Sequence, residues 1–189
     1  MTTINLQVGA STDDAEQSGT TVVLTGTSPD WDPSLWRGYR FLNVTIAQGA
    51  TIDAATAQFN CNSATDNDVR SDIYCEATDD ATTFTTGASD ISNRSRTTTK
   101  GDWDADNLTQ NAFATTSTLV GPVQEVINRA GWASGNDLNL IVETLTGSNA
   151  SITHYDGGST LAAKLDIDYT AAAGGTVKVR SLMMTGVGM

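Results

Sequence analysis

The chain is poor in proline, cysteine, histidine and basic residues. Its 189 residues include 3 prolines, 2 cysteines, 1 histidine and 10 lysines and arginines. Because His154 is the sole histidine, a histidine-rich metal site is excluded. The 22 acidic residues give a net charge of −12, and such a surface repels phosphate backbones. We therefore expect no nucleic-acid partner.

Long apolar runs are missing as well. No stretch approaches the length of a membrane span, so no membrane partner is expected. Residues 1–19 contain neither the basic region nor the apolar stretch of a secretory signal. We expect a protein that is made in the cytosol, with an acidic surface that keeps it soluble.

The abundant residues favour β-structure. There are 30 threonines and 17 glycines, and threonine favours strands while glycine favours turns. About eight short strands with turns between them predict an all-β fold, a jelly-roll-like antiparallel β-sandwich over residues 20–170. One short helix is expected at 121–130, where Pro122 opens an apolar stripe that includes Val123 and Ile127.

Two terminal arms are expected beside this domain, at 1–19 and 171–189. Residues 161–170 alternate apolar and polar side chains, which is typical of a closing strand with one face on a core. The following segment, 176–189, is apolar and has no carboxylate. Since the completed domain cannot bury it, we expect it to bind a partner, with Lys178 and Arg180 meeting an acidic surface. The candidate partner-binding residues are Val177, Val179, Leu182, Met183, Met184 and Val187.

Cys61 and Cys75 each lie in a strand-like stretch, and the polar residues between them resemble a hairpin. Paired strands could bring the two sulfurs together as a disulfide, worth about 3 kcal/mol for a loop of this size. Synthesis in the cytosol favours two buried free thiols instead.

The sequence offers no convincing catalytic set. No nucleophile-elbow motif accompanies His154, and no phosphate-binding glycine loop occurs. Asp79 and Asp80 are better interpreted as a solvated loop than as an acid–base pair, so we predict a protein that is not an enzyme. No cofactor is predicted, although Asp66, Asp68, Asp79 and Asp80 are weak calcium candidates whose spacing fits no EF-hand.

Several segments together resemble a known type of module. They are GYRFLNVTIAQGATIDAATAQF, IYCEATDDATTF, ISNRSRTT, VQEVINRAGWASGNDLNLIV and KLDIDYT, within Val22 to Tyr169. The chain resembles β-sandwich modules of bacterial secreted proteins, which are similar to carbohydrate-binding modules and jelly-roll adhesion domains. Similar modules occur in phage structural proteins. The resemblance implies the sandwich fold, and virion proteins assemble in the host cytoplasm without an export signal.

Two functions follow from this resemblance. The first is a structural protein of a tailed-phage virion, a capsid decoration or cement protein that forms a homotrimer and binds the major capsid protein through its arms. The alternative is a glycan-binding or host-adhesion module of a tail fibre or of an extracellular bacterial surface protein. For a glycan site we predict Trp31 and Trp103, because each lies between two aspartates in an apparent loop.

Overall fold

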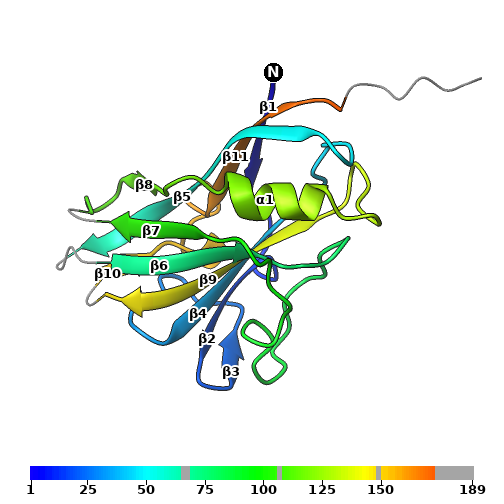
Figure 1. Ribbon diagram of the computed structural model, residues 1–189. Helices are drawn as coiled ribbons and strands as arrows, with labels where there is room; N and C mark the ends of the chain where they lie inside the picture. The colour runs from blue at the N-terminus through cyan, green and yellow to red at the C-terminus, as the bar shows by residue number, and fades with distance from the viewer. Residues whose placement is uncertain (65–68, 106–107, 148–149, 173–189) are drawn as a thin grey trace, which may run out of the picture.

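Two antiparallel sheets pack face to face (Figure 1). The computed structural model describes residues 1–64, 69–105, 108–147 and 150–172. The five-stranded sheet contains β1 (Thr2–Gln7), β11 (Lys164–Thr170), β5 (Thr51–Ala64), β10 (Ala150–Ile152) and β8 (Phe113–Thr115). The six-stranded sheet contains, in spatial order, β3 (Thr21–Val23), β2 (Asp14–Ser18), β4 (Leu35–Phe41), β9 (Leu138–Thr146), β6 (Val69–Cys75) and β7 (Gly101–Ala105). One α-helix, α1 (Val120–Ile127), and a 3₁₀ turn (Tyr155–Gly157) complete the secondary structure of the described residues.

The strand order is that of a jelly roll. Gln58 of β5 pairs with Lys164 of β11 and with Thr115 of β8, so those strands lie on opposite sides of β5. One sheet therefore has the order β1-β11-β5-β8, and the other contains the order β4-β9-β6-β7 and ends at β7. Except for the adjacent pair β6–β7, successive strands of this set alternate between the sheets, as in two nested Greek keys. The predicted fold class is confirmed.

The core lies between the two inner faces. Strand alternation sends Tyr39 and Phe41 of β4, Phe59 of β5 and Ile73 of β6 into it, all with no exposed surface. α1 buries Pro122, Val123, Val126 and Ile127 and packs on β5, with further contacts to β6 and β7. The predicted helix is thus present, and it closes one side of the sandwich (Figure 1). No helix in the described ranges is long and apolar enough to cross a membrane.

A second, smaller core forms on the outer face of the six-stranded sheet. The long connection from β6 to β7, residues 76–100, folds back over β2, β4 and β9. Phe84 and Ile91 of this connection are buried against Ala15 and Ile141. Gly38 of β4 permits the approach, because a Cβ there would lie 2.2 Å from Cζ of Phe84. The connection covers only part of this face.

Two sequence predictions need correction, and a third falls mostly outside the described residues. The expected N-terminal arm is part of the sandwich, since β1 pairs with β11 and β2 pairs with β4. The expected hairpin between the cysteines is instead a crossing between sheets, because β5 and β6 belong to different sheets. The chain is described through residue 172, so most of the expected C-terminal arm lies outside the described residues.

Candidate functional site

Two aromatic side chains lie on the outer face of the six-stranded sheet, at the margin of the smaller core that residues 76–100 cover. Trp36 of β4 and Tyr74 of β6 both point to the outer face, because they are out of phase with the buried residues on either side of them. Both are half-buried. β9 runs between their strands, and its Glu143 pairs with Trp36 on one side and Asp72 on the other.

Arg96 links the two rings. Its guanidinium carbon lies 4.7 Å from the centre of the Trp36 ring and 5.2 Å from that of Tyr74. Its Nη1 atom lies 3.6 Å from Oε2 of Glu143. A backbone bridge between Arg96 and Glu76 fixes this position beside β6. With 35% of its side chain exposed, Arg96 offers a planar cation to solvent between two aromatic groups.

Charged residues continue the surface toward β7. Lys100 Nζ lies 2.7 Å from Oδ1 of Asp72 and 2.9 Å from Oδ1 of Asp102. Its hydrogen bonds to these carboxylates raise the pKa of Lys100, and the same contact lowers the pKa of Asp102. Tyr74 donates its hydroxyl to Asp72 at 3.3 Å, and burial together with Asp72 raises the pKa of Tyr74, which keeps the phenol a donor at neutral pH.

The outer face of the six-stranded sheet has a depression next to these groups. This depression of about 330 Å³ is lined by outer-face side chains of β6, β7 and β9, together with Lys100 and the strand backbones. Arg70 pairs with Asp104 at 3.3 Å on its rim, and Leu145 gives it an exposed apolar wall. We call Trp36, Tyr74, Arg96 and Glu143, with this depression, the aromatic face. Stacking surfaces and fixed donors and acceptors are therefore adjacent on one rigid sheet.

The two tryptophans predicted for a glycan site lie elsewhere. Trp31 has no exposed surface and Trp103 is 3% exposed, so both belong to the core rather than to loops. Their ring centres are 5.3 Å apart, and Trp31 donates its Nε1 hydrogen to Ser71 at 2.8 Å. That prediction was wrong. Asp102 and Asp104 flank Trp103 because they lie on the opposite face of strand β7, and Asp30 and Asp32 flank Trp31 in the segment that leads to β4. Neither tryptophan lies in an exposed loop.

The calcium candidates divide in two. Asp66 and Asp68 lie outside the described residues. Asp79 accepts a hydrogen bond from Arg129 Nε at 2.6 Å, and Asp80 accepts one from the backbone N–H of Asp137 at 2.9 Å. Over the described ranges, no three His, Cys, Asp or Glu side chains gather in a way that would hold a metal.

Both cysteines are free and buried, which agrees with the preferred interpretation of two thiols. Cys61 lies on β5 and Cys75 on β6, so the sheets separate them. Burial raises the pKa of both thiols, which leaves them uncharged and unreactive at neutral pH. The predicted partner-binding residues, Val177 to Val187, lie outside the described residues.

His154 is a core residue. Its Nε2 lies 3.3 Å from the hydroxyl of Tyr39, and its Nδ1 lies 3.9 Å from Oδ1 of Asp14. Burial, aided by the charge of Arg37, lowers the pKa of His154 to about 3, so the contact with Asp14 is not an ion pair at neutral pH. No route from solvent reaches this fully buried group, which does not suit it for catalysis.

The sequence contained a signal for the aromatic face. In strand β4 Trp36 is out of phase with Tyr39 and Phe41, and in β6 Tyr74 is out of phase with Ile73 and Cys75. Strict alternation therefore assigns Trp36 and Tyr74 to the opposite face from the core. The role of Arg96 had no such signal, because it depends on how residues 76–100 fold back.

Fold and surface together define a jelly-roll β-sandwich with one aromatic, charged sheet face. No family model and no curated protein matches the chain. Among solved structures it is similar to a xylan-binding module CBM15, with 11% identity over 90% of this chain and 100% of the module and a TM-score of 0.46. It is also similar to a mutant of Xylanase10C from Cellvibrio japonicus in complex with xylopentaose, with 12% identity over 90% of this chain and 29% of that chain and a TM-score of 0.41. At these scores the similarities say nothing about what this chain binds.

Proposed function

We propose that this protein is a carbohydrate-binding protein without catalytic activity, which holds a polysaccharide chain on the aromatic face. The observation that carries the proposal is the half-buried pair Trp36 and Tyr74 on the outer sheet face, with Arg96 fixed between them. Aromatic rings offer a flat apolar surface to the C–H face of a sugar, and each retains a polar group for hydrogen bonding.

A neutral polysaccharide suits this face best. Arg70, Arg96 and Lys100 are each paired with a carboxylate, so the face has no large patch of a single charge. The paired groups retain lone pairs and N–H donors for sugar hydroxyls, which a fixed network can orient. A glycosidase needs two carboxyl groups on either side of the scissile bond, whereas Asp72 and Glu143 are each engaged by a cation.

The test is affinity electrophoresis and titration calorimetry with a panel of soluble neutral and uronic-acid polysaccharides. Trp36→Ala and Tyr74→Ala should each weaken binding of the best polysaccharide by about 5- to 30-fold, since an aromatic contact is worth about 1–2 kcal/mol. Phe113→Ala is the matched control, because it removes a half-buried aromatic residue from the outer face of the other sheet. Binding that survives both tryptophan and tyrosine changes, or a panel without any ligand, would refute the proposal.

The second candidate is a virion role, as a capsid decoration or cement protein that acts as a homotrimer on the head lattice. The uneven distribution of charge along the chain favours this role. Residues 173–189 have no acidic side chain and carry a net charge of +2. The remaining residues carry −14, which gives the net charge of −12 for the whole chain. Deleting residues 171–189 should leave thermal unfolding unchanged and abolish co-sedimentation with phage heads. Normal decoration by the truncated chain would exclude this role, and a location outside virions would leave glycan binding as the sole candidate.

A further inference from the structure

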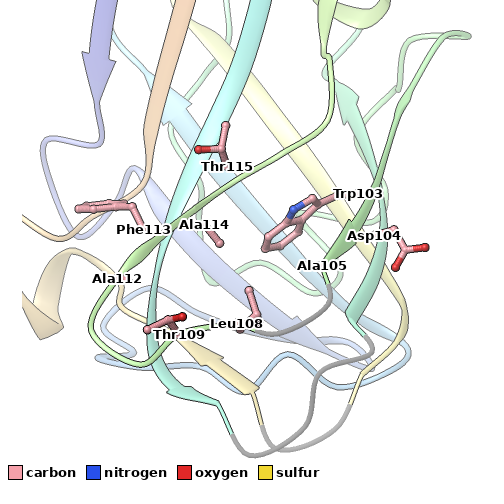
Figure 2. Close-up of a pocket in the computed structure, with 9 residues that line it drawn as sticks. All are labelled: Trp103, Asp104, Ala105, Leu108, Thr109, Ala112, Phe113, Ala114 and Thr115. Atoms are coloured by element: carbon pink, nitrogen blue, oxygen red, sulfur yellow. The ribbon is translucent and has the colours of Figure 1, made fainter.

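A pocket opens where the edges of the two sheets face each other (Figure 2). It has a volume of about 270 Å³ and lies between β7 and β8. The indole of Trp103 and the side chain of Leu108 point into it, and Ala105 and Ala114 line it from the two strands. Asp104 lies at its rim with 52% of its side chain exposed. This pocket shares Trp103 and Asp104 with the depression of the aromatic face, whereas Trp36, Tyr74 and Arg96 do not line it.

Both flanking strands are sheet edges. β7 pairs with β6 alone, and β8 pairs with β5 alone, among the strands of the described residues. Each edge therefore presents backbone N–H and C=O groups that an added strand can pair with. At one end of the pocket, the hydroxyl of Ser117 donates a hydrogen bond to the carbonyl of Asp102. The backbone of residues 103–105 remains available for pairing with an added strand.

The chain itself contains a segment with complementary chemistry. Residues 177–180 alternate valine with lysine or arginine, which is the period of a strand with one apolar and one basic side. Val177 and Val179 would fit against Leu108 and the accessible edge of Trp103, while Lys178 and Arg180 would lie on the side of Asp104, which keeps 52% of its side chain exposed beside Arg70. We propose that residues 176–182 of one copy of the chain bind in this pocket of a second copy, as an added strand.

Geometry favours a second copy over the same chain. β11 ends at Thr170 opposite Thr51, whereas β8 pairs with residues from Gln58 onward on the other side of β5. The straight line between these points is about 25–30 Å, from the rise per residue and the strand spacing. A fully extended chain from Thr170 to Val177 spans about 25 Å at most and would have to pass around the sandwich.

Self-association of the full chain is the test, measured by sedimentation velocity over a range of concentrations. Lys178→Glu with Arg180→Glu reverses the basic side, and Leu108→Asp places a charge in the pocket. Each variant should weaken association at least about tenfold. Leu161→Asp is the matched control, because Leu161 is an exposed leucine elsewhere on the sandwich. Trp36→Ala should associate as the wild type does, which separates this proposal from glycan binding.

Three outcomes would overturn the proposal. They are a full chain that stays monomeric at every concentration, association that tolerates the charge reversal, and association that tolerates Leu108→Asp. If circular dichroism shows that Leu108→Asp does not fold, the charge reversal decides alone, since its two positions are not among the described residues that form the sandwich. A monomeric full chain whose 1–172 form binds a 173–189 peptide would assign the pocket to the chain's own tail and reject the second copy.

Discussion

Asp14 is a carboxylate in the core of a very acidic protein. It lies on β2 with no exposed surface, and its Oδ2 accepts the backbone N–H of Tyr155 at 2.7 Å. Its Oδ1 has no hydrogen-bond partner. Burial, with smaller contributions from Asp156 and Asp13, raises the pKa of Asp14 to about 7. Its ionisation in the folded state is therefore unfavourable.

We predict that Asp14→Asn gains stability relative to the wild type as the pH rises. The folded pKa of about 7 exceeds the unfolded value of about 3.9, so the wild type loses free energy of unfolding between pH 4 and pH 7. Asparagine keeps the acceptor and cannot ionise, so the difference between variant and wild type should grow by about 2–4 kcal/mol over this range. Urea unfolding at several pH values measures it.

His154 contributes with the opposite sign. Its folded pKa of about 3 lies below the unfolded value of about 6.5, so its contribution is lost as the pH falls from 6.5 toward 3. In the wild type the two effects offset each other between about pH 4 and pH 6.5, whereas Asp14→Asn should lose stability on acidification there. Asp53→Asn, at an exposed position, is the control. A pH-independent difference for Asp14→Asn would contradict the assignment.

At the scale of elements, the connection from β6 to β7 contributes Arg96 to the aromatic face and Lys100 to its depression. Arg94 holds it in place. Its guanidinium bonds to the carboxylates of Glu76 and Asp90 and to the carbonyls of Thr82 and Thr83, and it lies 4.4 Å from the centre of the Phe84 ring. Only 7% of its side chain is exposed. Because Arg96 is two residues further along, this anchor also positions the cation between Trp36 and Tyr74.

We predict that Arg94→Met loosens residues 76–100 and lowers the free energy of unfolding by about 3 kcal/mol, since two carboxylates and two carbonyls each lose a hydrogen-bond donor. Hydrogen exchange should rise in this connection while β11 and β5 stay protected. Arg70→Met is the control, because the Arg70–Asp104 pair is half-exposed and worth less than about 1 kcal/mol. Unchanged exchange in residues 76–100 would rule out the anchoring role.

At the scale of the whole molecule, the net charge of −12 and the sequence pI of about 4.1 imply self-repulsion in the folded state. Salt screens this repulsion over a Debye length of about 10 Å at 0.1 M. We predict that raising NaCl from about 0.02 M to about 0.5 M increases stability by about 1 kcal/mol, or about 2–4 °C in Tm.

Differential scanning fluorimetry measures this effect, and CaCl₂ at equal ionic strength is its control. Equal Tm values in the two salts would attribute the gain to screening. An additional rise in calcium, reversed by EDTA, would instead indicate a calcium site. A Tm that falls with NaCl would show that the surface ion pairs outweigh the repulsion.

Local pattern was sufficient for the fold class and for most central strands. The alternation in 161–170 and the apolar stripe of Val123, Val126 and Ile127 correctly predicted β11 and α1. Strand β1 was missed because its outer residues, such as Thr3 and Asn5, are polar and its inner residues are only half-buried. Strand β2 was missed because Ala15 is its one apolar residue, while its buried Asp14 and Gln17 are polar. An edge strand such as β1 is recognised by the strand with which it pairs, and the local sequence does not identify that strand.

The sequence by itself determined which faces of β4 and β6 are buried, since alternation is a property of each strand alone. Alternation sets Trp36 and Tyr74 opposite the buried residues of their own strands, but the order β4-β9-β6 is what brings them to one outer face. Only the tertiary structure decided that Arg96 lies between the rings, that Cys61 and Cys75 are apart, and that β7 and β8 leave a pocket. These depend on contacts between residues far apart in the chain, which form only when the two sheets pack together.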